Sequence, residues 1–326
     1  MVKYIIKRLL WMIPIVLGVT VLVFTLMCFT PGNPAETILG ATATQEDLDA
    51  KTEELGLNDP YIVRLGNYMY QVFIQHDLGN SWITSVAIIP TIMERLPRTL
   101  MLTLCTMFIS FALGIPLGIV AATHQNRWQD SVSMVLALLG VAIPNFWLAL
   151  MLIIVFSVNL GWLPAMGIDA GIKSYILPAL AACMGSLATC ARQTRSSMLD
   201  VIRSDYITTA RSKGVPERDV VTKHALKNAL IPIITMAGST FGRLLGGMMI
   251  IETVFAIPGM GTYIIGAVNN RDYPIVQGGT IFLAITFSLC MLAVDLLYAA
   301  VDPRIKAQYA SKKKALKKQK EAAANG

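Results

Sequence analysis

The chain has 326 residues, of which 55% are hydrophobic and 14% charged, and its formal net charge is +7 at pH 7. So low a charged fraction is unusual for a soluble protein, and apolar runs of about 20 residues, the length that crosses a hydrocarbon layer, recur along it. The sequence therefore predicts an all-α integral membrane protein. It argues against nucleic acid as a partner, because the basic residues cluster beside apolar segments.

The first apolar segment, Leu9–Phe29, follows a short basic start and is ended by Pro31-Gly32-Asn33-Pro34. This stretch is too long for the core of a signal peptide, and no small-residue cleavage site follows it. Residues 1–30 are therefore predicted to be an N-terminal tail and an uncleaved transmembrane helix.

Residues 31–97 form a long polar region in which acidic residues outnumber basic ones. The pattern from Thr44 to Leu55 predicts an acidic helix with Thr44 at its N-cap. Tyr61–Ile74 predicts a second, amphipathic helix after a turn. We expect this region to lie outside the membrane.

Five more apolar segments follow in residues 98–302, which makes six predicted transmembrane helices in all. Proline and glycine punctuate several of them, which membrane helices tolerate better than soluble ones do. The five further predicted spans are Thr99–Ala121, Val132–Val158, Tyr175–Ala191, Ala229–Val254 and Gly278–Ala300.

The distribution of lysine and arginine predicts the orientation in the membrane. These residues are concentrated between the fourth and fifth spans, in residues 192–227, and in the tail, residues 303–326. Both regions and both termini are therefore predicted to be cytoplasmic. Residues 31–97, 159–174 and 255–277 are predicted to be external.

The cytoplasmic loop 192–227 has the pattern of a folded element. Asp205 is a plausible N-cap for a short helix at Tyr206–Lys213. Gly214 can then adopt the positive φ of a helix end, and Pro216 begins a new helix that continues into the fifth span. A short helix held at both ends by membrane spans suits mechanical coupling to a partner. Charge alone would fit an ordinary loop.

Ionisable residues inside predicted spans are candidates for a translocation path. Arg243 lies in the fifth span and Asp295 in the sixth, at depths that differ by roughly 12 Å, so a direct pair would need tilt or another subunit. Asn145 in the third span is a further path candidate. Glu252 lies near the outer end of the fifth span, where we expect it to be solvated.

Two pairs of glycines have the spacing of close helix packing in membranes. They are Gly114-x-x-x-Gly118 in the second span and Gly242-x-x-x-Gly246 in the fifth. Each predicts a close approach of another helix and no chemistry.

No motif for catalysis is present in the sequence. There is no phosphate-binding loop G-x-x-x-x-G-K-[ST], no H-E-x-x-H motif and no paired metal-ligand spacing. The three histidines are isolated, and the five cysteines lie in or beside apolar segments. We therefore predict no catalytic residue, no metal site and no cofactor in this chain, which cannot hydrolyse ATP itself.

The segment from Asp205 to Pro232 resembles the coupling motif of ABC-importer permeases. Within that group it is similar to the dipeptide/oligopeptide/nickel family, through Tyr206, Thr209-Ala210-Arg211, Lys213-Gly214 and His224–Pro232. Further motifs of the same family cover nearly the whole chain except the tail. They are Pro31–Ala35, Leu55–Leu57, Asp77–Ser81, Pro144–Trp147, Phe255–Gly261, Arg271–Pro274 and Asp302–Arg304.

The resemblance implies a type I ABC importer permease fold in a bacterial inner membrane. It implies two ATPase subunits that bind ATP and Mg²⁺, a homologous second permease and an external substrate-binding protein. It assigns coupling to the ATPase to Asp205, Tyr206, Thr209, Ala210, Arg211, Lys213, Gly214 and Glu217. It assigns contact with the binding protein to Asn270, Arg271, Asp272 and Tyr273, so replacing Arg271 and Asp272 together should reduce transport and leave assembly intact.

The implied function is import of di- or oligopeptides, with a nickel chelate or glutathione as alternative substrates. The alternative from a different class is a secondary transporter or channel that works without ATP. Such a protein would need relays of ionisable groups inside the membrane, and Arg243 and Asp295 alone are weak support for one. No inverted repeat is visible in the sequence. A membrane anchor is disfavoured by six spans with kinking residues. The lysine-rich tail could bind anionic lipid, although a solvated extension is favoured.

Overall fold

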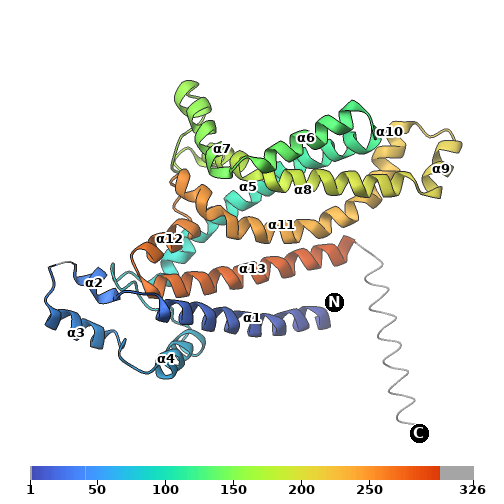
Figure 1. Ribbon diagram of the computed structural model, residues 1–326. Helices are drawn as coiled ribbons and strands as arrows, with labels where there is room; N and C mark the ends of the chain where they lie inside the picture. The colour runs from blue at the N-terminus through green and yellow to red at the C-terminus, as the bar shows by residue number, and fades with distance from the viewer. Residues whose placement is uncertain (1, 41, 302–326) are drawn as a thin grey trace, which may run out of the picture. The chain divides into compact units, whose positions relative to one another are not determined.

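A computed structural model of the chain describes residues 2–40 and 42–301, and its secondary structure is helical (Figure 1). Within those residues the only β pairing is an isolated bridge between Asn80 and Ala87, which confirms the all-α class. The predicted basic tail, residues 303–326, lies outside the described part. The α-helices are α1 (Val2–Phe29), α2 (Pro34–Leu39), α3 (Gln45–Glu54), α4 (Tyr61–Phe73), α5 (Ile88–Thr123), α6 (Trp128–Ala142), α7 (Asn145–Leu152), α8 (Ile176–Ile202), α9 (Asp205–Ser212), α10 (Glu217–Asp219), α11 (Leu226–Val254), α12 (Met260–Asn269) and α13 (Tyr273–Val301), with π-helical turns at Ile153–Asn159 and Val220–Ala225 and a 3₁₀ turn at Gly171–Tyr175.

Five helical segments of the described chain are long and apolar enough to cross a membrane. The predicted third span, Val132–Val158, is wrong as a single helix, because α6 ends at Ala142 and α7 begins at Asn145. Pro144 has φ −61° and ψ 132°. A proline lacks an N–H donor and disfavours helical backbone in the residue before it. Counting this broken pair as one span gives up to six. The five unbroken segments are Ile5–Phe29, Ile88–Thr123, Gly171–Ile202, Glu217–Val254 and Tyr273–Val294.

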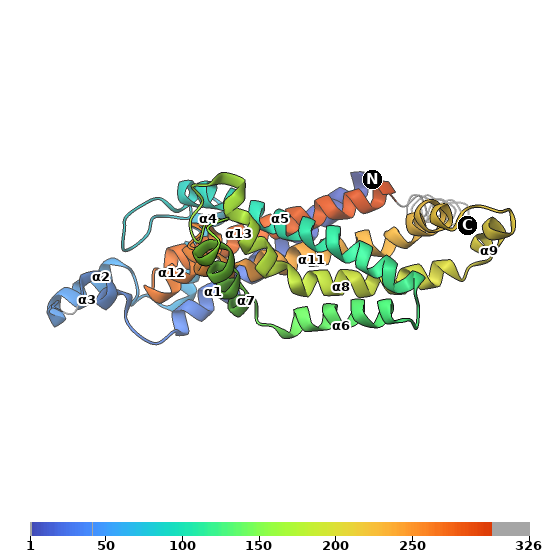
Figure 2. The same ribbon diagram turned by 90° about the horizontal axis from the view of Figure 1, so that it is seen from above.

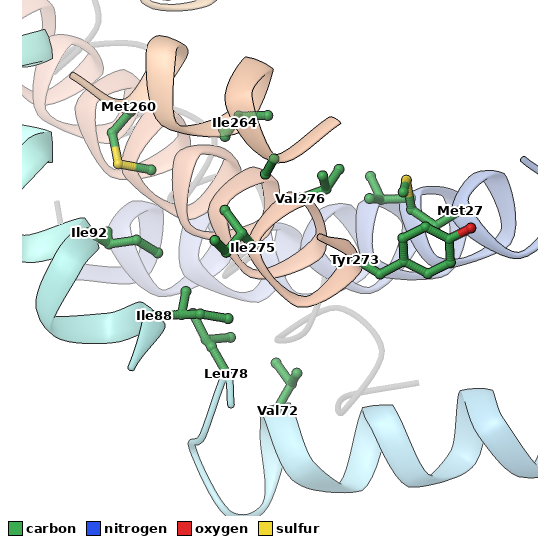
Figure 3. Packing of buried hydrophobic residues seen from close by; sticks show 12 residues of the cluster. Met27, Val72, Leu78, Ile88, Ile92, Met260, Ile264, Tyr273, Ile275 and Val276 are labelled. Atoms are coloured by element: carbon green, nitrogen blue, oxygen red, sulfur yellow. The ribbon is translucent and has the colours of Figure 1, made fainter. Parts of the chain in front are cut away.

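The chain divides into two compact units, and the first comprises residues 1–109, 143–183 and 243–289. One of its two apolar cores gathers side chains from α1, α4, α5, α12 and α13 (Figure 3). There Met27 and Val72 join Ile88, Ile264 and Val276, which lie far apart in sequence. The second core joins α5, α7, α8 and the end of α11 through Leu102, Ala149, Leu177, Met248, Ile251 and Phe255.

The predicted helices of the 31–97 region are confirmed in the first unit. The Thr44 hydroxyl accepts from Asp47 N, and the Asp47 carboxylate accepts from Thr44 N, which forms a capping box. The side-chain bond from Thr44 lowers the pKa of Asp47. Helix α4 packs on α1, where the rings of Tyr61 and Tyr68 lie 5.8 and 5.5 Å from that of Phe24.

The second unit comprises residues 110–142, 184–242 and, within the described part of the chain, 290–301. Its apolar core joins the ends of α5 and α8 to α9 and the start of α11, through Ala122, Met198, Ile207, Val220, Ala225 and Ala229. Ile207 of α9 is fully buried in this core. Helix α9 lies where α8 ends, as both views show (Figures 1 and 2), and α10 follows it.

The first glycine pair packs closely, as predicted, whereas Gly246 of the second pair has no close neighbour among the described residues. A Cβ added at Gly118 would lie 2.5 Å from Thr194 Cβ and 2.6 Å from the carbonyl oxygen of Ala191. In contrast, within the described residues no heavy atom beyond the surrounding backbone of its own helix lies within 4 Å of a Cβ added at Gly246. The spacing therefore marks a contact of α5 with α8 in the second unit, whereas Gly246 faces open space.

Substituting Gly118 by alanine should destabilise the protein by about 1–3 kcal/mol, because a methyl group there would overlap backbone that cannot move freely. Thermal unfolding of the purified protein in detergent measures this effect. Gly246→Ala is the matched control and should leave the melting temperature unchanged. Equal melting temperatures for the two variants would show that α5 and α8 do not pack as closely as described.

Candidate functional site

The first candidate site is the α9 segment, which we define as residues 205–219. Helix α9 runs from Asp205 to Ser212, and Gly214 then has a φ of +78°. Gly214 N donates to Arg211 O at 2.9 Å, and Val215 N donates to Ala210 O at 3.3 Å. The predicted helix, its positive-φ break and its continuation through α10 into α11 are therefore confirmed.

The start of α9 differs from the prediction by one residue. Ser204 occupies the N-cap, with φ −77° and ψ 150°, and Asp205 is the first helical residue. The Ser204 hydroxyl makes no capping bond within the described residues, and it donates to Val201 O at the end of α8 at 2.5 Å. Helix α8 also runs to Ile202, well beyond the predicted end of the fourth span.

Side-chain contacts hold α9 against α10 and α11. The Arg211 guanidinium donates to both carboxylate oxygens of Glu217, at 3.0 and 2.7 Å, across the Gly214 turn. Asn228 of α11 donates to the Tyr206 hydroxyl at 2.8 Å. The Arg211 and Glu217 side chains are 40% and 61% exposed, so their pair stabilises the fold by no more than about 1 kcal/mol.

The predicted coupling residues lie on the surface of the segment. Ala210 is half-buried, and the other seven are exposed: Asp205, Tyr206, Thr209, Arg211, Lys213, Gly214 and Glu217. Beneath them, Ile207 anchors the helix in the core of the second unit. The arrangement can present a rigid polar surface to a partner, and a coupling role for these residues stays a prediction.

A partly buried ion pair in the second unit was not predicted from the sequence. Asp130 of α6 is 5% exposed and accepts from Arg195 Nε at 2.6 Å and Arg195 Nη2 at 2.7 Å. Asn126 N also donates to it, at 3.1 Å. In the sequence, Arg195 is one of many basic residues of the predicted cytoplasmic loop 192–227. The pair joins the start of α6 to α8, the helix that leads into α9.

The path candidates lie on three different helices. Arg243 of α11 and Asn145 at the first position of α7 are exposed. Asp295 lies in α13, and its side chain lies outside the described part of the structure. A role for these residues in translocation stays a prediction.

Two of the four predicted binding-protein contacts are buried in the structure. Asp272 and Tyr273 are 2% and 4% exposed. Asp272 accepts from the Ser81 hydroxyl at 2.5 Å and from Trp82 N at 3.1 Å, and the rings of Tyr273 and Trp82 lie 5.4 Å apart. Both side chains are therefore occupied inside the first unit, where the turn between α12 and α13 packs on residues 78–85.

The other two contact candidates remain accessible. Asn270 is exposed and Arg271 is half-buried. A Cβ added at Gly32 would collide with the Arg271 guanidinium. The Pro31–Pro34 motif thus lies against the Arg271–Pro274 motif, and the glycine provides room for the arginine.

Replacing Asp272 by alanine should lower the stability of the protein by about 2 kcal/mol, because the Ser81 hydroxyl and Trp82 N would lose a charged acceptor. This corrects the expectation that substitution there leaves assembly intact. Asn270→Ala in the same turn is the matched control and should not change the melting temperature. Equal melting temperatures for the Asp272→Ala and Asn270→Ala proteins would contradict a role for Asp272 in holding this turn on residues 78–85.

The prediction that Glu252 is solvated is wrong, because the residue is fully buried. Its carboxylate accepts from the Thr99 hydroxyl at 2.6 Å and from Thr262 N at 3.0 Å, and Thr99 in turn accepts from Met260 N at 2.8 Å. A Cβ at Gly259 or Gly261 would overlap this carboxylate. The Phe255–Gly261 motif therefore brings the N-terminus of α12 onto the acid, where the helix dipole favours negative charge.

Residues 255–277 are predicted to be an external loop, but the structure has a helix, α12, within them. It spans Met260–Asn269 and buries Met260, Ile264 and Ala267 in the first unit. Arg98 Nη1 donates to Pro258 O at 3.1 Å, and the Arg95 guanidinium lies 4.8 Å from the centre of the Tyr263 ring. The segment is a packed element of the fold.

Comparison with known proteins identifies the family. Residues 114–307 match the model described as "Binding-protein-dependent transport system inner membrane component", and residues 1–103 match its N-terminal companion. The dipeptide transport system permease protein DppB of Alkalihalophilus pseudofirmus is 44% identical, covering 94% of this chain and 100% of that protein. A putative peptide transport system permease protein of Brucella abortus is 42% identical, covering 94% and 99%.

Two further similarities agree with this. The glutathione transport system permease protein GsiC of Salmonella typhimurium is 42% identical, with coverage of 94% and 99%. Among solved structures, the inward-facing MetNI methionine ABC transporter matches with a TM-score of 0.56 and 21% identity, over 66% of this chain and 97% of that one. The latter is a likeness of fold and confirms the type I permease architecture. The chain therefore belongs to the family of inner membrane components of binding-protein-dependent transport systems.

Proposed function

We propose that this chain is a permease subunit of an ATP-driven importer of di- or oligopeptides. The observation that carries the proposal is its 44% identity to a dipeptide permease over the full length of that protein. The α9 segment supports it, because a short helix anchored by Ile207 and braced by Arg211 and Glu217 suits contact with a moving partner.

In the proposed complex two ATPase subunits bind ATP and Mg²⁺, and one of them docks on the α9 segment. A homologous second permease completes the path, since six spans enclose only half of it. Both termini and the α9 segment face the cytoplasm, and residues 31–97 and 255–277 face an external binding protein that delivers substrate. ATP binding and hydrolysis in the partners drive alternating access.

Glutathione is a second candidate substrate, because the chain is also 42% identical to a glutathione permease over nearly the full length of both proteins. Glutathione is itself a tripeptide derivative. The two proposals therefore differ in the chemistry of the substrate and not in the mechanism of the permease.

Mild affinity purification of this chain from its native membrane, followed by mass spectrometry, tests the proposal. We expect a second permease and phosphate-loop ATPases to co-purify, and peptide uptake by the cells to follow cellular ATP. Recovery of a homo-oligomer of this chain alone, with uptake that follows the proton gradient, would contradict it. Competition between glutathione and a tripeptide for uptake separates the two substrates.

A further inference from the structure

A cavity of about 500 Å³ lies in the first unit, where α3 and α4 meet residues 78–85 and the start of α13. Its volume falls within the range of roughly 300–1,000 Å³ typical of small-ligand sites. It is distinct from the α9 segment and from the Asn270–Arg271 surface. Its walls carry charged, amide and aromatic groups together.

Arg64 supplies a positive charge to this cavity. Its guanidinium lies 6.0 Å from the centre of the Phe24 ring and donates one long hydrogen bond, of 3.4 Å, to Leu57 O. Among the described residues no carboxylate forms an ion pair with it. A guanidinium has five N–H donors in a planar fork that matches a carboxylate, so most of its capacity is available to a ligand.

Two uncharged groups in the same walls also lack partners. The Tyr68 hydroxyl is buried, and no described atom accepts or donates a hydrogen bond to it. Burial raises the pKa of Tyr68, so the hydroxyl stays a neutral donor. The Gln277 side chain is 6% exposed and has no hydrogen bond within the described residues. A buried polar group without a partner, such as the Tyr68 hydroxyl, is rare in proteins, and a bound ligand is one way to satisfy it.

The remaining walls complete the chemistry of the site. Glu54 and Asp59 line the cavity and provide negative charge, although Glu54 also pairs with Lys51 at 2.8 Å. The Trp82 and Tyr273 rings form an apolar wall. Charges of both signs, amide-binding groups and an aromatic surface in one cavity fit a small zwitterion with peptide bonds.

We propose that this cavity is an entry site for a short peptide with free termini. Its C-terminal carboxylate would bind Arg64, its amide groups would bind Tyr68 and Gln277, and its ammonium group would face Glu54 and Asp59. The inference rests on the proposed function, which provides the substrate class. It adds a place where this chain itself contacts the peptide before translocation.

Calorimetric titration of trialanine into the assembled complex, in nanodiscs and without the binding protein, tests this site. Arg64→Gln should weaken binding roughly tenfold or more, and Tyr68→Phe about threefold to tenfold. Tyr70→Phe on the same helix is the matched control, because Tyr70 is 56% exposed and does not line the cavity. It should bind trialanine like the unmodified complex.

C-terminal amidation of trialanine gives the sharper comparison. Amidation should weaken binding to the unmodified complex as much as Arg64→Gln does, and should have little further effect in the Arg64→Gln complex, because the two changes remove the same contact. Tyr68→Phe should not lower the melting temperature, since the lost hydroxyl has no protein partner. This separates loss of ligand binding from loss of folding.

Three results would overturn the entry site. The first is that the Arg64→Gln and Tyr68→Phe complexes both bind trialanine as tightly as the unmodified complex does. The second is that the complex does not bind trialanine by itself but still transports it when the binding protein is present, and the third is that Arg64→Gln weakens only the association of the complex with the binding protein. The last would assign the cavity to protein docking. If the complete system with its binding protein transports no peptide at all, the proposed function itself fails.

Discussion

Replacing Gly214 by valine should reduce substrate-stimulated ATP hydrolysis of the assembled importer by roughly tenfold or more. A reduction of this size corresponds to the loss of a coupling free energy of about 1–3 kcal/mol. Gly214 has a φ of +78°, and a β-branched residue is a severe outlier there. The turn would rearrange, and the Arg211 guanidinium would no longer meet both oxygens of Glu217. ATPase activity measured with and without substrate and binding protein reports the effect.

Two controls isolate coupling from folding. Gly214→Asn should retain much of the stimulation, because asparagine tolerates left-handed backbone better than valine does. Gly161→Val is the matched control for strain, since Gly161 has a φ of +65° and, like Gly214, no heavy atom within 4 Å of an added Cβ. Equal loss of stimulation in Gly161→Val and Gly214→Val would contradict a specific role for the α9 turn.

Replacing Glu252 by alanine should destabilise the protein by on the order of 3 kcal/mol, because two buried donors lose their acceptor and a cavity remains. The donors are the Thr99 hydroxyl and Thr262 N at the start of α12. We expect α12 to detach from α5 and α11 in this variant. The melting temperature of the purified protein and its yield from membranes measure the loss.

Glu252→Gln separates the acceptor role from the volume of the side chain. Glutamine fills nearly the same space and offers one oxygen acceptor, so its effect should be smaller than that of alanine. Glu94→Ala is the exposed control, since the Glu94 side chain is 68% exposed and pairs with Arg98 on the surface. A Glu252→Ala protein as stable as Glu94→Ala would show that the buried network does not hold α12.

Several elements could be predicted from the sequence because their signals are local. The capping box at Thr44, the helix at Tyr61–Phe73 and the left-handed turn at Gly214 each depend on residues within a few positions of one another. The third span could not be predicted as a broken pair, because membrane helices often contain proline and its presence alone does not decide whether a helix kinks or ends.

The polar residues of the candidate sites show the limit of local signals. Thr99 meets Glu252 across 153 positions, Ser81 meets Asp272 across 191, and Arg195 meets Asp130 across 65. Nothing beside Glu252 or Asp272 in the sequence indicates these partners. Both acids therefore looked like surface residues.

The sequence by itself determined that the protein is a helical membrane permease of a recognisable family, with a short polar helix and a glycine turn between two spans. Those conclusions depend on apolar length, on local periodicity and on the backbone freedom of single residues. Only the tertiary structure decided which charged and polar side chains are buried and which are free to bind a partner or ligand. The reason is that burying an acid is tolerable only where donors from distant segments converge on it, and that convergence is a property of packing.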